Sequence, residues 1–425
     1  MLNKAYKILM SLLFFCSCSN DFETPKKYVL KVKGIITNGA LASGEKYLYI
    51  NNGKIAEIFS KESEIKSLDV NILDRSEFYI MPGFIDTHTH VFLTDHTYDE
   101  NLAVGMKASM QDKQRVDKAK KRISSLLENG FVVIRELGNS GRFLDAKLSL
   151  MTQKNKSLGP QIIYSGPGIC VFPCQFEEKD SSEIVEKEYF VIKNIAEGKK
   201  AIESVKAQGA EWVKLYADNI PSEGVMTPKL FKALVEYAKK NKLKIAAHTI
   251  NKEGTRMAIE SGVNSIEHVE FLSKEDAILA AKKNIYLVPT DHSPKTVIRV
   301  IEKRKISQNY VDRQIKLKKE RLKNAFFNGV FSAFGSDYYF PISHDSSFGK
   351  ESLETIMSYA YLGVDNRNIF MMLTKNAATL LGKSSLGEIR KGANATFILM
   401  KKNPLENLEY FFAKKQVYID GARVR

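Results

Sequence analysis

Short apolar runs alternate with longer amphipathic stretches over most of the chain, and this alternation limits the possible folds most narrowly. The stretches between the runs carry apolar residues at helical spacing, as in residues 229–239. Eight alternations are the count of a (β/α)8 barrel, which we predict as the α/β fold. An open, doubly wound sheet is the competing architecture, but no glycine-rich phosphate loop follows any run. The eight runs lie at residues 84–85, 131–135, 161–164, 212–216, 244–248, 265–268, 285–288 and 331–334.

Both flanks of this region have the texture of β-strands. Short strand-like pieces follow Tyr28 and are separated by glycines and by Asn52-Gly53, a strong hairpin signal. Similar pieces return after Leu381. We predict that the flanks pair into one small domain, a β-sandwich of residues 28–80 and 384–425, beside a barrel of residues 81–383.

The N-terminus has the features of an export signal. Lys4 and Lys7 precede an apolar stretch that is too short to span a bilayer, and Ser17-Cys18 closes it. This segment resembles a bacterial lipobox. It implies a lipoprotein-type signal peptide at 1–18, a polar tether at 19–27, and lipidation of Cys18, which would anchor the protein to a membrane of the bacterial cell envelope. An ordinary cleaved signal and a periplasmic protein are the alternative.

The net charge of +15 does not by itself indicate a partner. Lysines are spread along predicted helix faces, as at residues 118–121, which favours a solvated surface over attraction to an anionic envelope or acidic ligands. No nucleic-acid motif accompanies the charge, so we expect no nucleic-acid partner. Only Cys170 and Cys174 remain for the mature chain, in a loop-like segment, and a local disulfide is favoured over metal binding.

Polar residues that can bind metals stand where the predicted strands end. His88 and His90 are two residues apart in an extended run, so both side chains should point to the same side. Each histidine or lysine at a strand end also has an ordinary explanation, taken alone. A lone histidine is more often simply hydrogen-bonded than a metal ligand, and a lone lysine can extend to solvent. Strand ends of a barrel converge on one mouth, however, so together they predict a metal site. The set comprises His88, His90, Lys214, His248, His268 and Asp337.

Several motifs, in this order, resemble those of the amidohydrolase superfamily over nearly all of the mature chain. Within it the resemblance is to imidazolonepropionase-like and Xaa-Pro dipeptidase-like members with a lysine on the fourth strand. The motifs are PGFIDTHTH (82–90), WVKLY (212–216), AAH (246–248), IEH (266–268), FGSD (334–337), TKNAAT (374–379) and GEIRKGANA (387–395).

The resemblance implies a site with two divalent metal ions, for which zinc is favoured and manganese or cobalt stays open. His88 and His90 with Asp337 would hold one ion, and His248 with His268 the other. Lys214 would bridge both as a carbamate formed with carbon dioxide, because a desolvated lysine has a lowered pKa.

The same resemblance implies hydrolysis by a metal-bridging hydroxide. Asp337 would take and return the proton, and Tyr216, two residues after Lys214, would stabilise the oxyanion unless it only packs. Arg135 and His292 are candidate contacts for a small-molecule substrate, and the alternative is a structural hydrogen bond or ion pair.

We expect a C-N amide bond to be cleaved, in a dipeptide or an N-acyl amino acid. The alternatives are a cyclic-amide hydrolase or deaminase, a phosphotriester or lactone hydrolase, and a non-catalytic binding lipoprotein. Lys214 argues against most deaminases, and the intact ligand set argues against a binding protein. Residues 165–176 depart from the glycine- and histidine-rich segment of peptidase-like members, which leaves the substrate open. A homo-oligomer is possible.

Overall fold

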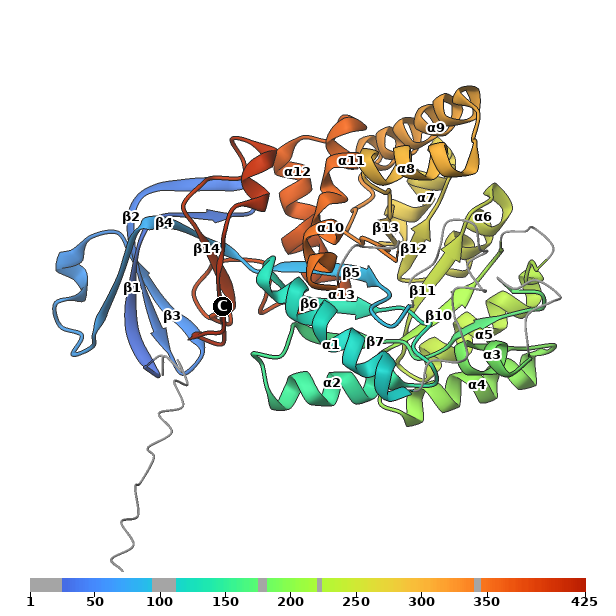
Figure 1. Ribbon diagram of the computed structural model, residues 1–425, viewed down its shortest axis with the longest axis horizontal. Helices are drawn as coiled ribbons and strands as arrows, with labels where there is room; N and C mark the ends of the chain where they lie inside the picture. The colour runs from blue at the N-terminus through green and yellow to red at the C-terminus, as the bar shows by residue number, and fades with distance from the viewer. Residues whose placement is uncertain (1–24, 94–111, 175–181, 220–223, 340–344) are drawn as a thin grey trace, which may run out of the picture.

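The computed structural model describes residues 25–93, 112–174, 182–219, 224–339 and 345–425, arranged as an α/β fold. A sheet of blue and red strands lies at one end, and strands flanked by helices make up the rest (Figure 1). The predicted signal peptide and Cys18 lie outside the described residues, as does most of the tether.

The flanks form one seven-stranded sheet. The N-terminal flank supplies β1 (Lys27–Thr37), β2 (Ala40–Asn51), β3 (Lys54–Phe59) and β4 (Ile72–Pro82). The C-terminal flank supplies β14 (Phe397–Met400), β15 (Gln416–Ile419) and β16 (Ala422–Arg423). The strand order is β16-β15-β14-β4-β1-β2-β3, so the flanks meet where β14 pairs antiparallel with β4.

The predicted pairing of the flanks is thus confirmed, but a β-sandwich is not. All seven strands are hydrogen-bonded neighbours in a single sheet, rather than members of two facing sheets. The predicted turn is also present, since Asn52 and Gly53 join β2 to β3 with φ of 47° and 77°. Two successive left-handed residues suit a tight hairpin, and glycine adopts this conformation without strain.

The remaining strands make two parallel sheets. One contains β5 (Phe84–Thr89), β6 (Phe131–Glu136) and β7 (Gln161–Tyr164). The other has the order β13-β12-β11-β10-β8-β9. Its strands are β8 (Gly168–Cys170), β9 (Tyr189–Val191), β10 (Trp212–Tyr216), β11 (Lys244–Thr249), β12 (Ser265–His268) and β13 (Tyr286–Val288).

Neither parallel sheet closes on itself in the described residues, so a closed eight-stranded barrel stays a prediction. Backbone hydrogen bonds nevertheless connect the eighth predicted run to both sides. Ser332 bridges Leu287 of β13, and the Thr87 amide of β5 donates to the Phe334 carbonyl over 2.8 Å. The run at 331–334 therefore lies between β13 and β5 and is hydrogen-bonded to both, although only its bridge to Leu287 counts as strand pairing in the described residues.

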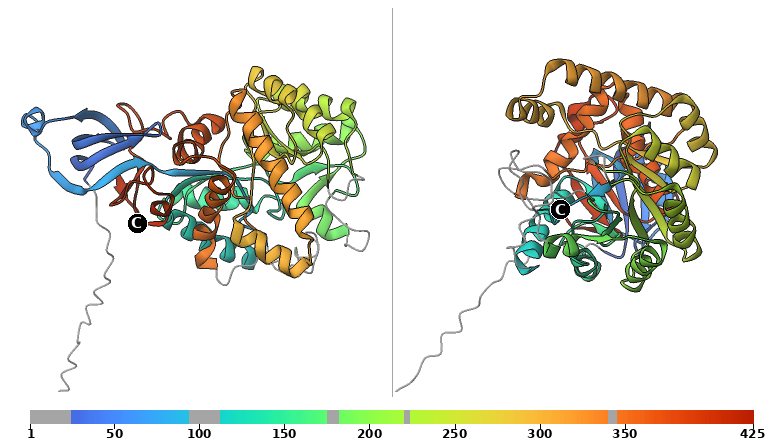
Figure 2. Two further views of the ribbon diagram at one scale, coloured as in Figure 1. Left: turned by 90° about the horizontal axis from the view of Figure 1, so that it is seen from above. Right: turned by 90° about the vertical axis from the view of Figure 1, so that its right-hand side faces the viewer.

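Helices lie outside these strands (Figure 2). In chain order, the first of these helices are α1 (Asp112–Glu128), α2 (Leu144–Lys154), α3 (Ser182–Glu188), α4 (Ile195–Ala207), α5 (Pro228–Lys240), α6 (Lys252–Ser261) and α7 (Lys274–Lys282). They are followed by α8 (Pro294–Arg304), α9 (Gln308–Phe327), α10 (Phe348–Glu354), α11 (Ile356–Tyr361), α12 (Asn366–Met371) and α13 (Ala377–Leu381). Among the described residues, no helix combines the length and apolarity that crossing a bilayer would require.

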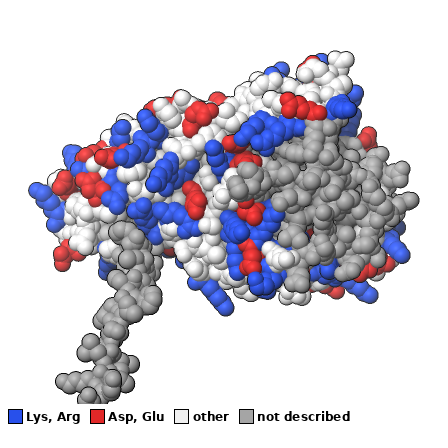
Figure 3. Space-filling model, viewed as in Figure 1, with Lys and Arg blue, Asp and Glu red and all other residues white. Residues whose placement is uncertain are grey.

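The surface in Figure 3 carries lysine and arginine side chains interspersed with acidic ones. Exposed side chains also form ion pairs, such as Lys113 with Asp117 and Lys401 with Glu77. The solvated role of the excess positive charge stays a prediction.

Candidate metal centre

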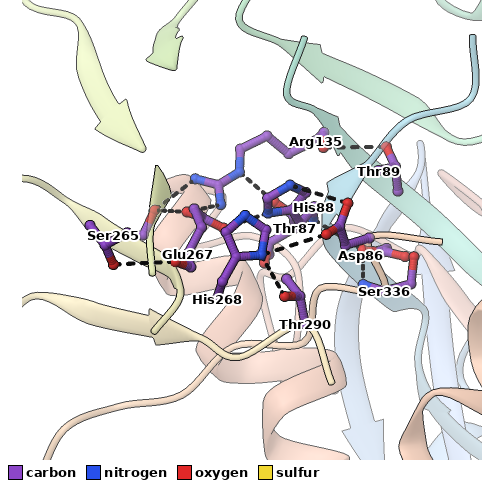
Figure 4. A network of polar contacts seen from close by, with 12 residues as sticks. Asp86, Thr87, His88, Thr89, Arg135, Ser265, Glu267, His268, Thr290 and Ser336 are labelled. Atoms are coloured by element: carbon purple, nitrogen blue, oxygen red, sulfur yellow. Dashed lines mark hydrogen bonds and ion pairs between the residues drawn. The ribbon is translucent and has the colours of Figure 1, made fainter. Parts of the chain in front are cut away.

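The polar side chains that end the strands meet inside the molecule. β5 carries His88 and is buried along its whole length, and His90 follows it directly. β12 contributes His268, and its imidazole lies close to that of His88 in Figure 4. Parallel strands expose their C-terminal ends at one edge, which explains why residues far apart in the sequence share one space.

Asp337 is fixed against this edge by its backbone. Its amide donates to the His88 carbonyl over 2.8 Å, and its φ of 45° is in the left-handed region. Gly335 permits the close approach of the two segments, because a Cβ there would lie 2.7 Å from the Cβ of His88. The carboxylate consequently points at both histidines of β5, with Oδ1 3.2 Å from His90 Nε2 and 3.6 Å from His88 Nε2.

The Nδ1 atoms of His88 and His90 both face oxygen acceptors, so their Nε2 atoms face each other and Asp337. His88 Nδ1 lies 2.8 Å from Glu267 Oε2, and His90 Nδ1 lies 3.2 Å from the Gly138 carbonyl. Each Nδ1 donates to its oxygen, which orients the ring so that Nε2 is the nitrogen available to a metal ion. The two Nε2 atoms are 3.3 Å apart and both face Asp337. Two imidazole nitrogens and a carboxylate that converge in this way are the ligand types that divalent metals such as zinc prefer, so the residues fit a metal ion.

The other two histidines extend the cluster. His268 Nδ1 is 2.8 Å from the Thr290 hydroxyl and 3.5 Å from Asp337 Oδ2. The His248 ring lies 4.4 Å from that of His268, and His248 Nε2 is buried and has no hydrogen-bond partner among the described residues. Ligand atoms of His88, His268 and Asp337 all lie within 4.8 Å of one another, which makes these three a candidate metal site. The His268 ring thus lies between that of His88, 5.1 Å away, and that of His248, and the assignment of each ligand to one ion stays a prediction.

Burial keeps the cluster in the protonation state that metals require. Burial first, and then the charge of Lys214, holds the pKa of His88 and of His248 well below the ordinary value. Burial alone would raise the pKa of Asp337, but His88 and His90 outweigh it and the pKa is lowered. At neutral pH His88 and His248 are therefore neutral and Asp337 is ionised.

Lys214 occupies the interior of β10 and is 1% exposed. Burial lowers the pKa of its amine to about 8, so that about a tenth of the amine is neutral at pH 7. Its Nζ lies 5.4 Å from the centre of the Tyr216 ring. The predicted carbamate on Lys214 is not part of the structure, and its formation stays a prediction.

Tyr216 also lies in this space. Its ring is 4.8 Å from that of His248 and 5.5 Å from that of Tyr189. Burial raises the pKa of its hydroxyl well above the ordinary value, so the hydroxyl keeps its proton and can donate. Its place beside a predicted ligand suits the expected oxyanion contact, which stays a prediction.

The two predicted substrate contacts have different surroundings. Arg135 is fully buried, paired with Glu267, and its guanidinium lies 4.2 Å from the centre of the Trp212 ring. These are the contacts of a structural ion pair, the alternative considered from the sequence. His292 packs edge-on to Tyr339 at 6.1 Å, and burial lowers its pKa to about 4. Both substrate assignments stay predictions.

Two further features complete the site. Cys170 and Cys174 form the expected disulfide, in a cluster with Leu93, Tyr189 and Tyr216. Glu267, the partner of His88, carries no assignment from the sequence, although it stands beside His268 in the IEH motif. The only signal in the sequence was a carboxylate inside an apolar strand, which demands a buried partner.

Comparisons with known proteins agree with this architecture. The family model described as "Amidohydrolase family" matches residues 79–424. The ochratoxinase of Aspergillus niger is 23% identical over 366 residues, which cover 80% of this chain and 73% of the relative. The imidazolonepropionase of Thermoanaerobacter pseudethanolicus is 24% identical over 408 residues and 87% of each chain.

Solved structures give the same result for the fold. A Xaa-Pro dipeptidase with bound methionine superposes with a TM-score of 0.79 at 21% identity, over 93% of this chain and 99% of the other. The Aspergillus niger ochratoxinase structure has a TM-score of 0.77 at 20% identity, over 94% of this chain and 95% of the other. Because the family model spans most of the sequence, including every residue of the metal cluster, this chain belongs to the amidohydrolase family of enzymes.

Proposed function

We propose that the protein hydrolyses a C-N amide bond with two divalent metal ions, for which zinc is favoured. The observation that carries this proposal is the convergence of His88 Nε2, His90 Nε2 and the Asp337 carboxylate on one point. His248 and His268 extend the set of donors toward a second position. Lys214, buried in the same space, would join the two positions as a carbamate.

Bound divalent ions would supply Lewis-acid activation of water and of the substrate carbonyl. Asp337, ionised and close to His90, is placed to accept a proton from the attacking water and to return it to the leaving amine. Tyr216, which keeps its proton, would donate to the oxygen that gains charge. Burial of these groups limits competing water and strengthens each polar interaction.

We propose a dipeptide or an N-acyl amino acid as the small-molecule substrate. The support is the fold shared with a Xaa-Pro dipeptidase and an ochratoxinase. A cyclic-amide hydrolase is the second candidate, supported by the likeness to imidazolonepropionase along 87% of the chain. Deamination, phosphotriester or lactone hydrolysis and simple binding remain the further alternatives.

The first test is elemental analysis of metal per purified chain, followed by a hydrolysis screen on the same sample. The screen would hold dipeptides, N-acyl amino acids and cyclic amides, with chelator-treated protein as the control. We expect two ions per chain and chelator-sensitive amide cleavage. One ion with deamination would favour the deaminase, and no metal after supplementation would contradict the proposal.

We further propose that the protein is a lipoprotein of a bacterial envelope, anchored through Cys18. The support is the lipobox-like sequence, which lies outside the described residues. Cys18→Ala should release the protein from the membrane fraction of expressing cells, whereas wild type should stay with it. Continued membrane partitioning of the variant would contradict lipidation at Cys18.

A further inference from the structure

A fully buried ion pair lies directly behind His88. Glu267 and Arg135 have no exposed surface, and their side chains are 2.9 Å apart, from Arg135 NH2 to Glu267 Oε1. We propose that this pair is a positioning device, in which Glu267 fixes the tautomer and orientation of His88 for metal binding and Arg135 holds Glu267 in place. The inference rests on the proposed function, because it concerns how the metal ligands are presented.

The two carboxylate oxygens of Glu267 accept hydrogen bonds from different partners. Oε2 accepts from His88 Nδ1 over 2.8 Å, and Oε1 accepts from Arg135 and from the Ser265 hydroxyl. The carboxylate cannot turn without breaking a bond to an element on either side. Figure 4 shows Glu267 between Ser265 and His88 with the guanidinium above it.

Arg135 connects the same carboxylate to the strand that bears His88. Its Nε donates to the Thr87 carbonyl over 2.5 Å, and NH1 donates to Ser265 Oγ over 3.2 Å. The face of the guanidinium rests on Trp212. The planar fork of arginine thus fixes three positions at once: β5, β12 and the carboxylate between them.

The arrangement determines which nitrogen of His88 is available. With Nδ1 committed as a donor to Glu267, the lone pair is on Nε2, which faces His90 and Asp337. A carboxylate behind a ligand histidine fixes the ring and raises its basicity, and loss of such a partner typically weakens metal binding by about 10- to 100-fold. A buried ion pair contributes little net stability by itself, so positioning is a better reason for its presence than stability.

The test compares Glu267→Gln with a matched control, Asp276→Asn. Asp276 is also buried and paired with an arginine, Arg256, but it touches none of the predicted metal ligands. The affinity for Zn2+ would be measured by competition with a coloured chelator, and the unfolding of each metal-free protein by calorimetry. We expect about 10- to 100-fold weaker Zn2+ binding for Glu267→Gln and wild-type affinity for Asp276→Asn.

Nitrogen shifts of 15N-labelled histidines in the metal-free proteins provide a readout that stability alone would not move. Wild-type His88 should show the tautomer with the proton on Nδ1, and Glu267→Gln should show a mixture of tautomers. Equal Zn2+ affinity together with an unchanged tautomer in Glu267→Gln would overturn the inference.

Should Glu267→Gln fail to fold, Ser265→Ala answers the same question. It removes the hydroxyl that contacts both Glu267 and Arg135 but leaves the ion pair intact. We expect Zn2+ binding about two- to tenfold weaker, the effect of one hydrogen bond, and unchanged affinity would overturn the inference. Failure of wild type itself to bind Zn2+ would instead contradict the proposed function, so the two failures are distinguishable.

Discussion

Asp337 combines two properties that usually exclude each other, burial and a lowered pKa. It is 7% exposed, and the nearby His88 and His90 more than offset the effect of burial on its pKa. A carboxylate in this state is ionised at neutral pH and can accept a proton from water as soon as substrate binds. The left-handed backbone at Asp337 and the close approach at Gly335 indicate that this placement depends on the local chain path.

Asp337→Asn should therefore remove turnover while the bound metal largely remains. The amide keeps the shape and one oxygen ligand but cannot take the proton, so we expect kcat to fall by about 10²- to 10⁴-fold. Steady-state rates on the best substrate of the screen and elemental analysis of the same sample provide the measurement. An asparagine variant with wild-type kcat would show that another group moves the proton.

Lys214→Ala tests the proposed bridge between the metal ions. The amine lies inside β10 with 1% exposure, so its removal leaves a small space that acetate or propionate can enter. We expect the metal content to drop toward one ion or none and to recover partly with a short carboxylic acid, whose oxygens would replace the carbamate. Two tightly held ions in the variant without added acid would be incompatible with a bridging role.

At the scale of the elements, the sequence predicts strands that have a strong apolar pattern of their own. It does not predict a strand that forms only because it pairs with another strand far away in the sequence. β7 and β10 coincide with the predicted runs, because apolar and β-branched residues signal a buried parallel strand by themselves. β8 was expected to be a loop, since Gly168 and Cys170 carry no strand signal; its pairing with β10 at Ile169 and Leu215 creates the strand.

The same limit applies to the candidate site. Histidine spacing and strand ends were enough to bring His88, His90, His268 and Asp337 together, and the structure places all four in one cluster. The role of Glu267 depends on contact with a histidine 179 residues away. The alternation of residues along a strand predicts which face of the sheet a side chain points to. It does not predict which side chain of another strand it will contact.

The loop held by the Cys170–Cys174 disulfide is the element for which we expect a measurable effect on substrate binding. Both cysteines are buried in a cluster with Tyr189 and Tyr216, and the Tyr216 ring lies beside that of His248. Cys170→Ala with Cys174→Ala should raise KM, because the loop loses its link beside the site, and lower the free energy of unfolding by about 1 to 3 kcal/mol. Wild-type KM in the double variant, with the fold verified by circular dichroism, would show that this loop does not shape the binding site.

At the scale of the whole molecule, the seven-stranded sheet of the flanks is joined directly to the parallel strands that carry the metal cluster. β4 ends at Pro82 and β5 begins at Phe84, so a single residue separates the two parts. The C-terminal flank returns to the same place, because the Lys415 side chain lies over the Phe84 ring at 5.7 Å. Lys415 is buried, and its amine donates to the carbonyls of Phe411 and Ala413 over 2.6 and 3.1 Å.

This buried lysine should make stability depend on pH. Burial lowers the pKa of Lys415 to about 7 in the folded protein, whereas the ordinary value of 10.5 applies when the chain is unfolded. Between these values the unfolded state binds more protons, so protonation favours unfolding and stability rises with pH. Below about pH 7 both states carry the proton and the dependence disappears.

Lys415→Met removes this contribution, so the stability of wild type relative to the variant should increase from pH 7 to pH 9 by about 1 to 3 kcal/mol. Urea unfolding of both proteins at the two pH values provides the measurement. Lys401→Met, which replaces a lysine whose side chain is 62% exposed, is the matched control and should show no such change. A difference between wild type and Lys415→Met that stays constant with pH would mean that the two carbonyls stabilise the charged amine enough to cancel the cost of its burial.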